Sequence, residues 1–365
     1  MRKVGVSGIE KVLLAMSGGV DSSCAAVLLQ QQGYQVAGAT LKLHQQKDPQ
    51  RTGLCGSADD VEDARRVAEH LGMEHFLLDQ QELFRQKVMD YFVTSYCSGR
   101  TPNPCIECNT YLKFGVLLDW ALSQGFDYIA TGHYARTLRD EKRGRWLLLR
   151  GQDRQKDQSY VLYRLTQRQL AHLLLPLGSY DKPSIRSLAE QAGLKNAHKP
   201  DSQDICFVPD GDYVRFLQDY GKIRLSPGNF VDRQGHILGR HRGLPCYTAG
   251  QRKGLGVSGG RPLYVLEKNA EDNTVVLGDN SELFCRTVWG SSPNWISIPS
   301  LTAPLEVTAK TRYSQKEAAA VLYPEADGSI RAEFEEGQRA VTAGQAMVFY
   351  QDDIVVGGAT IEAAK

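Results

Sequence analysis

The sequence predicts an α/β fold in which a doubly wound parallel sheet is followed by a small central domain and a C-terminal β-barrel. Two observations indicate this fold. Residues 11–130 alternate short apolar runs with helical patterns, and after about residue 210 short strands separated by turns take over. Strands that are separated by helices imply right-handed crossovers, and such crossovers produce a parallel sheet.

The α/β part can be followed element by element. Residues 11–16 and 34–43 are apolar runs that predict strands, and a glycine-rich turn and a helical pattern lie between them. Residues 58–72 form an amphipathic pattern that ends at Gly72, a common way for a helix to end. A strand, a further helix and the strand-like run DYIATGHYA at 127–135 follow.

The rest of the chain has the spacing of short strands. The segments GNFVDRQGHILGRH and LEKNAEDNTVVLGDN predict two hairpins. From about residue 285 onward, further short strand-like runs predict a small barrel. We therefore predict three domains, at residues 1–212, 213–284 and 285–365.

Composition limits the class of protein. The 365 residues are 42% hydrophobic and 23% charged, which is typical of a globular chain. No apolar run approaches the roughly 20 residues that span a bilayer, and the N-terminus lacks the apolar segment of a signal peptide. We expect a cytoplasmic protein without a membrane partner. Its eight cysteines are then expected to be core residues, metal ligands or catalytic thiols.

The net charge of +1 argues against a globally basic nucleic-acid binder. A local basic patch is nevertheless present between Arg136 and Arg168, where aromatic residues alternate with cations. Two interpretations stay open for it, a solvated basic face and a track for a phosphate backbone. Its members are Arg139, Lys142, Arg143, Arg145, Arg150, Arg154, Lys156 and Arg164, with Trp146, Tyr160 and Tyr163 between them.

The segment AMSGGVDSS, residues 15–23, predicts a phosphate-binding loop. It lies between a strand and a helix, and its two glycines let successive backbone N–H groups point at an anion. Asp21 would repel a phosphate unless it holds a cation, so the loop also suggests Mg²⁺. The simpler alternative is a helix N-cap. The predicted nucleotide-binding residues here are Ala15, Met16, Ser17, Gly18, Gly19, Val20, Asp21 and Ser22.

The segment TPNPCIEC, residues 101–108, holds two cysteines three positions apart. The helical pattern that follows begins at Asn109 and places Cys108 at or near the helix N-cap, where the helix field would favour a thiolate. A structural zinc site is not predicted, because a second Cys-x-x-Cys or a histidine pair is missing from the sequence. An iron–sulfur site that uses Cys105, Cys108 and Cys206 stays open.

These motifs carry a family resemblance. SGGVDSS resembles the signature of the N-type ATP pyrophosphatases, which have an adenine nucleotide alpha-hydrolase-like fold and adenylate an acceptor oxygen. The whole chain resembles the tRNA-specific 2-thiouridylases. The shared motifs are AMSGGVDSS, GRTPNPCIECN, DYIATGHYAR, KDQSYVLYRL, DSQDICFVP, YTAGQRKGLG, KTRYS and AVTAGQAMVFY.

The resemblance implies an enzyme that uses ATP and Mg²⁺ to replace the C2 oxygen of a wobble uridine in tRNA by sulfur. It implies that Cys108 is the nucleophile, that Cys206 carries a persulfide, and that the two form a disulfide in each cycle. Whether the persulfide attacks directly or Cys108 first frees hydrosulfide stays open. The sulfur would come from a persulfide donor, which is either a cysteine desulfurase or a relay protein.

The resemblance also implies binding residues. Leu41 and Gly132 would line the nucleotide site, although core packing explains Leu41 equally well. The residues that would contact tRNA or the flipped base are Asn103, Pro104, Cys105, His133, Lys156, Asp157, Gln158, Arg312, Tyr313 and Gln345. Two alternatives stay open. One is another ATP pyrophosphatase, such as a tRNA lysidine synthetase or an amidating ligase, and the other is an iron–sulfur or metal-binding module.

Overall fold

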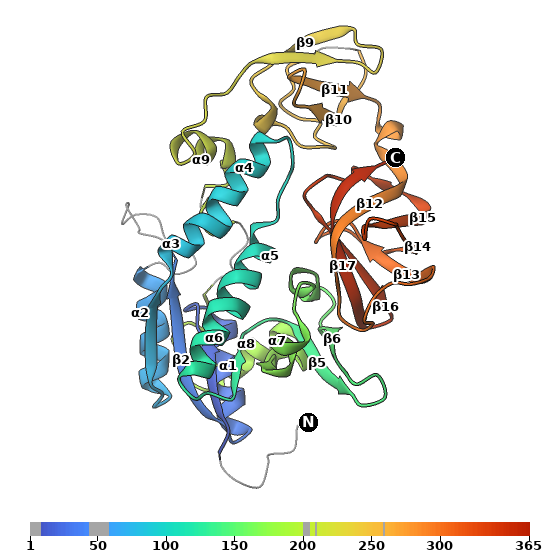
Figure 1. Ribbon diagram of the computed structural model, residues 1–365. Coiled ribbons are helices and arrows are strands. Elements are labelled where there is room, and N and C mark those ends of the chain that lie inside the picture. The colour runs from blue at the N-terminus through green and yellow to red at the C-terminus, as the bar shows by residue number, and fades with distance from the viewer. Residues whose placement is uncertain (1–8, 44–57, 200–204, 209, 258–259) are drawn as a thin grey trace. The chain divides into compact units, whose positions relative to one another are not determined.

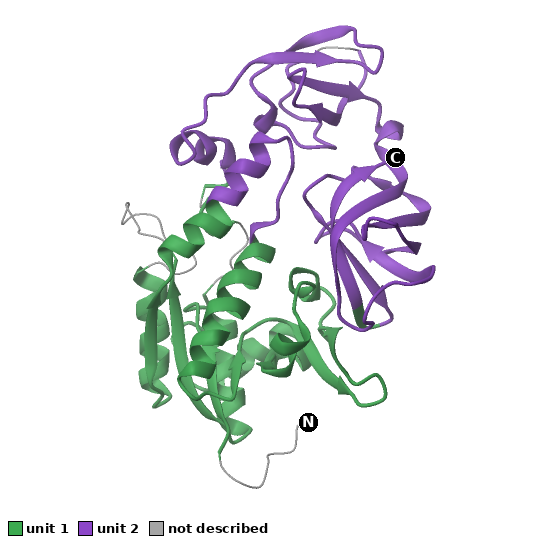
Figure 2. Cartoon of the chain, in the orientation of Figure 1, with its two compact units in different colours: residues 1–89, 105–211, 353–355 green, residues 90–104, 212–352, 356–365 purple. Residues whose placement is uncertain are grey.

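The computed structural model describes residues 9–43, 58–199, 205–208, 210–257 and 260–365. The chain divides into two compact units, each described here by itself (Figures 1 and 2). Unit 1 comprises residues 1–89, 105–211 and 353–355. Unit 2 comprises residues 90–104, 212–352 and 356–365.

Unit 1 is built on a parallel five-stranded sheet in the order β3-β2-β1-β4-β7, so the predicted α/β class is confirmed. The strands are β1 (Lys11–Ala15), β2 (Gln35–Lys42), β3 (His75–Asp79), β4 (Tyr128–Ala130) and β7 (Leu173–Leu174). The chain moves outward from β1 to β3 and then returns to the other side of β1. Ligands of such sheets bind where this reversal occurs, at the carboxyl ends of β1 and β4.

Both faces of the sheet are covered. Val12, Leu13 and Leu14 of β1 are all fully buried although consecutive strand residues point to opposite faces. One face packs against α1 (Val20–Gln31), α2 (Ala58–His70) and α8 (Lys182–Gln191). On β3, the ring of Phe76 lies 5.1 Å from that of Trp120 in α6 (Leu117–Ser123).

The helix that carries Cys108 begins earlier than the sequence predicted. It runs without interruption through α5 (Pro104–Cys108), the π-helical η2 (Asn109–Val116) and α6. Pro104 occupies the first helical position, where proline's fixed φ and missing N–H are tolerated. The expectation that the helix begins at Asn109, with Cys108 at or near its N-cap, is therefore wrong. Cys108 is the fifth helical residue, and Cys105 is nearer to the helix start.

The other elements of unit 1 surround this framework. They are α3 (Gln81–Phe84), most of the π-helical η1 (Arg85–Asp90), β5 (Ala135–Asp140), β6 (Arg145–Arg150), η3 (Ser159–Leu162), α7 (Gln167–Ala171) and η4 (Pro176–Ser179).

Unit 2 contains both predicted hairpins. They are β8 (Gly228–Val231) with β9 (Ile237–His241), and β10 (Tyr264–Asn269) with β11 (Thr274–Gly278). Parallel pairing of β11 with β8 joins them in one sheet. The unit also contains α4 (Tyr91–Cys97), α9 (Tyr213–Asp219), η5 (Leu244–Cys246) and η6 (Asn280–Leu283).

The C-terminal strands of unit 2 form the predicted barrel. Their order is β12-β15-β14-β13-β16-β17, and β12 also pairs with β17, which closes the sheet on itself. The strands are β12 (Phe284–Trp295), β13 (Leu305–Lys310), β14 (Ala318–Pro324), β15 (Ile330–Arg339), β16 (Ala346–Gln351) and β17 (Ile354–Ala364). The three domain boundaries given above stay a prediction.

Within the described ranges, no helix combines the length and the apolar character that crossing a membrane would require.

Candidate active site

The predicted phosphate loop follows β1 and leads into α1, at the point where the strand order reverses. Its backbone conformation depends on Gly18, which has φ +71°. A Cβ atom there would lie 2.5 Å from the backbone oxygen of Asp60. Two hydrogen bonds within the loop stabilise this conformation. The Ser22 hydroxyl donates to the Gly19 carbonyl at 3.0 Å and accepts from the Ser17 N–H at 3.3 Å.

The start of α1 is suited to an anion. Gly19 is the N-cap residue of α1. Among the described residues, no side chain makes a capping hydrogen bond at this end of α1. The N–H groups of a first helical turn have no partners within the helix, and they carry the positive end of the helix dipole. The loop can therefore offer backbone donors to a phosphate.

A buried lysine balances the acidic residue of the loop. Lys182, at the first position of α8, is 7% exposed and donates to both carboxylate oxygens of Asp21, at 2.8 and 2.9 Å. The Tyr134 hydroxyl donates to the same carboxylate at 2.8 Å. The role of Lys182 is not visible in the sequence, because 161 positions separate it from Asp21 and no local pattern links them.

The opposite side of the loop is held by the turn that follows α8. The amide nitrogen of Asn196 donates to the Gly18 carbonyl at 3.0 Å and to the Ser23 hydroxyl at 2.8 Å. The ammonium of Lys199 lies 2.8 Å from a carboxylate oxygen of Asp60 and 2.8 Å from one of Asp63. These contacts are not visible in the sequence either, because they join segments far apart in the chain.

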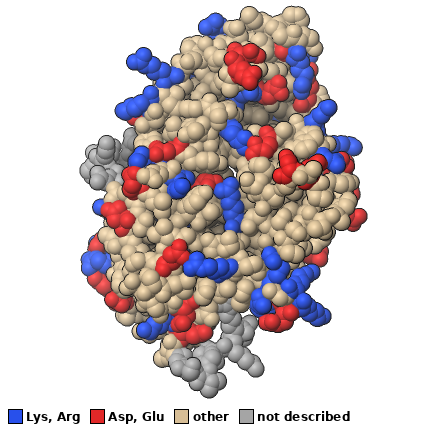
Figure 3. Space-filling view, viewed as in Figure 1, with Lys and Arg blue, Asp and Glu red and all other residues tan. Residues whose placement is uncertain are grey.

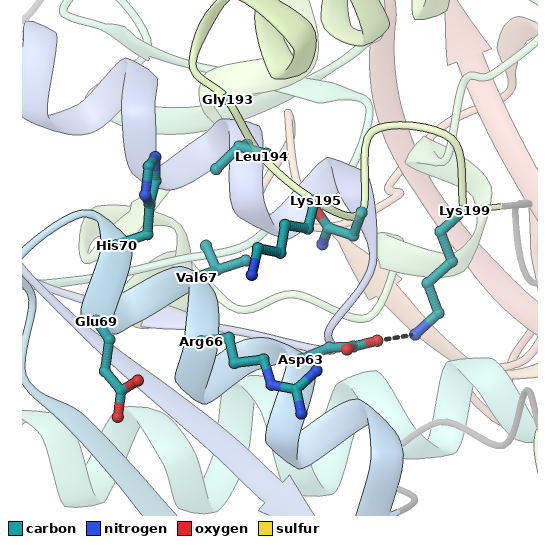
Figure 4. Close-up of a pocket in the computed structure, with 10 residues that line it drawn as sticks. Asp63, Arg66, Val67, Glu69, His70, Gly193, Leu194, Lys195 and Lys199 are labelled. Carbon is teal, nitrogen blue, oxygen red and sulfur yellow. Dashed lines mark hydrogen bonds and ion pairs between the residues drawn. The ribbon is translucent and has the colours of Figure 1, made fainter.

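A cavity of about 630 Å³ lies beside this turn, between α2 and the residues after α8 (Figure 4). The close-up shows the Lys195 side chain extending across it and Lys199 joined to Asp63. Its lining contains none of the predicted nucleotide-binding residues. The lining residues are Asp63, Arg66, Val67, Glu69, His70, Gly193, Leu194, Lys195, Asn196 and Lys199.

The two other predicted nucleotide-site residues lie near the ends of β2 and β4. Leu41 is 8% exposed near the end of β2, and its contact with a nucleotide stays a prediction. Gly132 follows β4, and a Cβ atom there would lie 2.9 Å from the backbone of Asp21 and of Ser22. The sheet thus brings Gly132 against the phosphate loop, as a shared nucleotide site requires.

His133, predicted to contact tRNA, is buried. Its Nδ1 lies 2.7 Å from the Thr131 hydroxyl, and burial holds its pKa well below the usual value, with the charge of Lys113 acting in the same direction. A neutral, buried imidazole does not attract a phosphate by charge. Contact of His133 with tRNA stays a prediction.

The cysteines differ in exposure. Cys105 is exposed, whereas Cys108 and Cys206 are partly buried. Between Cys105 and Cys108 lies Glu107, which is 5% exposed and accepts a hydrogen bond of 2.6 Å from Arg164. Burial raises the pKa of Glu107, while the neighbouring guanidinium opposes the rise. This ion pair joins the helix that carries Cys108 to the basic patch between Arg136 and Arg168.

The Lys-Asp-Gln segment predicted to contact tRNA has internal hydrogen bonds. Asp157 accepts from the N–H groups of Gly151 and Ser159 at 2.9 and 3.1 Å. The side chain of Gln158 accepts from the Tyr134 N–H at 3.0 Å. These bonds hold the turn against the segment after β4, while Lys156 is partly exposed beside it.

In unit 2, Gln345 and Arg312 also make internal contacts. The Gln345 amide donates to the carbonyls of Thr101 and Pro102 at 2.9 and 3.3 Å, which fixes the backbone just before Asn103 and Pro104. Arg312 donates to the carbonyls of Ala249, at 3.2 Å, and Ala340.

Tyr313 differs from its neighbour Arg312. It is 41% exposed, and the ammonium of Lys310 lies 5.7 Å from the centre of its ring. An exposed aromatic ring beside a cation is suited to stacking with a base.

Metal ligands show no preformed cluster. Among the described residues, no group of three or more His, Cys, Asp or Glu is arranged to hold a metal ion. Magnesium at ATP sites needs only one or two carboxylates, because phosphates and water supply the other oxygens. Asp21 therefore fits as the protein ligand of a nucleotide-bound Mg²⁺.

A parallel sheet with a glycine-rich phosphate loop at its point of reversal defines a nucleotide-binding α/β protein. Three family models match the chain in order. They are described as the tRNA methyl transferase HUP domain at residues 10–210, the tRNA methyl transferase PRC-barrel domain at 214–279 and the aminomethyltransferase beta-barrel domain at 286–361. The chain belongs to the family of the tRNA-specific 2-thiouridylases, as its full-length relatives show.

One relative, the tRNA-specific 2-thiouridylase MnmA of Acetivibrio thermocellus, is 50% identical over 97% of this chain and 99% of its own length. The protein of the same name from Moorella thermoacetica is 51% identical over 96% of this chain and 99% of its own length. Among solved structures, the U34-tRNA thiolase NcsA of Methanococcus maripaludis with its [4Fe-4S] cluster is 20% identical. The similar region covers 58% of this chain and 66% of the NcsA chain, with a TM-score of 0.34. This similarity is too weak to add to the family assignment.

Proposed function

We propose that the chain catalyses the ATP-dependent 2-thiolation of the wobble uridine of tRNA, with 2-thiouridine, AMP and pyrophosphate as products. The observation that carries the proposal is the phosphate loop with Lys182 at the carboxyl edge of the sheet. It occurs in a chain that is half identical, over nearly its full length, to curated 2-thiouridylases.

The C2 oxygen of uridine must be activated before sulfur can replace it, because oxide is a poor leaving group. Adenylation converts this oxygen into part of AMP, which leaves readily. The N–H groups at the start of α1 and the ammonium of Lys182 would stabilise the charge of the departing pyrophosphate. Mg²⁺, held by Asp21 and the phosphates, would neutralise part of the same charge.

Sulfur delivery would use the two cysteines that the family resemblance singles out. The terminal sulfur of a persulfide on Cys206 attacks C2 and AMP departs. The thiolate of Cys108 then attacks the remaining sulfur–sulfur bond, which releases the thiolated base. In the other order, Cys108 first frees hydrosulfide, which attacks C2. Both routes end with a Cys108–Cys206 disulfide that a reductant must open.

The target base would leave its stack to reach the reacting groups. Asn103, Pro104 and Cys105 would form part of the wall around it. Gln345 supports this role, because it holds the backbone immediately before Asn103. Lys156 and Tyr313 would contact the tRNA outside the flipped base. The sulfur donor would be a desulfurase or a relay protein that carries a persulfide.

Three serine variants test the proposal against the iron–sulfur alternative. Cys108→Ser and Cys206→Ser should form no 2-thiouridine, measured by mass spectrometry of digested tRNA, and should keep their ATP affinity, measured by calorimetry. Cys105→Ser separates the two alternatives. Serine keeps nearly the size of the side chain in the proposed wall, and the persulfide route does not use the Cys105 thiol, so most of the activity should remain.

A cluster bound by all three cysteines predicts another pattern. All three variants would then lose activity, and anaerobically purified wild-type protein would contain iron and sulfide in stoichiometric amounts. If Cys108→Ser and Cys206→Ser both still thiolate tRNA, the proposed roles of the two cysteines are wrong.

A further inference from the structure

The hairpin formed by β5 and β6 carries a concentrated positive charge. Between Ala135 and Arg150 it contains six cationic and two acidic residues, whereas the whole chain of 365 residues has a net charge of +1. Figure 3 shows lysine and arginine side chains gathered over this hairpin, at the lower right of the view. We call Arg139, Lys142, Arg143 and Arg145 the hairpin surface. The first three of these are exposed, and Arg145 is partly exposed.

The turn of the hairpin is held in one conformation by Asp140. One of its carboxylate oxygens accepts from the N–H groups of Lys142 and Arg143 at 3.0 and 3.1 Å, and the other accepts from the Arg143 guanidinium at 2.9 Å. These hydrogen bonds lower the pKa of Asp140, the backbone bond from Arg143 most of all. The backbone of the turn and the Arg143 guanidinium are therefore held in place, so the turn has less conformational entropy to lose on binding.

The strand residues beside the turn are fixed as well. The backbone N–H of Trp146 donates to the Gln167 side chain at 2.8 Å, and the Gln167 amide donates to the Trp146 carbonyl at 2.9 Å. The Arg139 guanidinium lies 5.8 Å from the centre of the Trp146 ring and donates to the Gly144 carbonyl at 3.0 Å. An arginine held against an aromatic ring keeps its charge available at the surface.

The acidic residues of the hairpin do not balance its cations. Asp140 faces Arg143, and a carboxylate oxygen of Glu141 lies 3.8 Å from Arg139, at a site where both side chains are solvent-exposed. Exposed ion pairs of this kind contribute little energy and are easily exchanged for contacts with another anion. The four cations of the hairpin surface therefore exceed its two acidic residues by two positive charges, whereas Arg136, at the other end of the hairpin, pairs with Asp353.

We propose that the hairpin surface binds the phosphate backbone of the tRNA substrate, away from the uridine that is modified. The proposal rests on the function proposed above. A tRNA fits because its backbone carries a negative charge at every nucleotide. Several cations along one hairpin can contact successive phosphates of such a backbone. Contacts to phosphate set affinity and register without reading sequence, so they serve every tRNA that the enzyme modifies.

The test uses the full-length double variant Lys142→Gln/Arg143→Gln, with the affinity for unmodified tRNA measured by filter binding between 50 and 300 mM KCl. Each phosphate contact contributes roughly 0.7–0.9 to the slope of log affinity against log salt concentration, so loss of two contacts should make the variant's slope shallower by about 1.4–1.8. Its Kd for tRNA at low salt should rise about 10-fold or more, while its affinity for ATP stays unchanged.

The matched control is Arg65→Gln/Arg66→Gln on α2. It removes the same charge from two exposed arginines, and these are also paired with an acidic residue of their own helix turn. The control should keep the wild-type slope and Kd. Thermal unfolding of both variants shows whether either change disturbs the fold.

Two outcomes would overturn the proposal. In the first, the hairpin variant has the wild-type salt slope. In the second, the control variant loses as much affinity as the hairpin variant, which would mean that only total charge matters. A hairpin variant that binds tRNA normally but no longer accepts sulfur from its protein donor would assign the surface to that donor instead. If the wild-type protein neither binds nor thiolates tRNA, the proposed function itself has failed.

Discussion

Replacing Asp21 by asparagine should change the affinity for ATP in opposite directions with and without Mg²⁺. Asp21 accepts two hydrogen bonds from the buried Lys182, and both would be given up if Lys182 turned to a phosphate. Without Mg²⁺, the carboxylate both repels the phosphates and retains the lysine. With Mg²⁺, the same carboxylate is the proposed ligand of the ion.

The structure sets the size of the effect. The Lys182 side chain is 9% exposed, but Asp21 is 33% exposed and keeps the Tyr134 hydroxyl as a second partner. Charged hydrogen bonds contribute about 1.5–3 kcal/mol each when buried, and partial exposure reduces this, so we take about 1–2 kcal/mol for the pair. Asp21→Asn should therefore bind Mg²⁺-free ATP about 5–30-fold more tightly and Mg²⁺–ATP more weakly than the wild type.

Calorimetric titration of ATP in EDTA and in excess Mg²⁺ measures both affinities. Asp353→Asn is the matched control, because Asp353 is 40% exposed and lies 2.7 Å from a cation, Arg136, but belongs neither to the phosphate loop nor to the turn that holds it. The control should shift neither affinity by more than about twofold. If Asp21→Asn shifts both affinities in the same direction, or shifts neither, the assignment of Asp21 and Lys182 to the triphosphate is refuted.

Three further predictions concern single side chains. Asn196→Leu removes an amide that donates to the Gly18 carbonyl, so the planar peptide between Gly18 and Gly19 can turn its N–H away from the phosphate. The KM for ATP should then rise about 5–30-fold, while the KM for tRNA stays constant. Burial lowers the pKa of Lys268 to about 8, so the unfolded chain binds the proton of this ammonium more tightly than the folded chain does. The unfolding temperature should therefore rise between pH 8 and 10, and Lys268→Met should make this rise smaller. Tyr313→Ala should raise the KM for tRNA several-fold at constant KM for ATP, whereas Tyr313→Phe, which keeps the ring, should behave as the wild type.

Local patterns predicted most of the fold. The apolar run at 11–16, the glycines after it and the amphipathic residues of 58–72 each fix a short stretch of backbone, and the structure has β1, the loop and α2 at these places. The sequence pattern places the start of the helix that carries Cys108 at Asn109, because the apolar spacing becomes visible only there, whereas the helix starts at Pro104. Pro104, a good first residue for a helix, was the local signal that could have corrected it.

The candidate site was only partly predictable, and the parts that were missed have a common cause. Glycine conformation and the first turn of α1 are properties of consecutive residues, so the phosphate loop is visible in the sequence. Lys182 and Asn196 act on that loop from positions 161 and 178 residues away. Their side chains have no distinctive local context, and only the return of the chain beside β1 gives them a role.

The contacts around the loop also explain why a nucleotide with its metal, rather than a bare anion, suits this site. On one side of the loop Asp21 and Lys182 neutralise each other, and on the other side Asn196 and Lys199 engage the Gly18 carbonyl, Asp60 and Asp63. A bare phosphate would have to displace the buried Lys182 from the partly exposed carboxylate of Asp21 and leave that carboxylate beside a new negative charge. A phosphate that arrives with a divalent cation supplies a partner for the carboxylate in the same event. Binding is then an exchange of partners, and no charge is left buried alone.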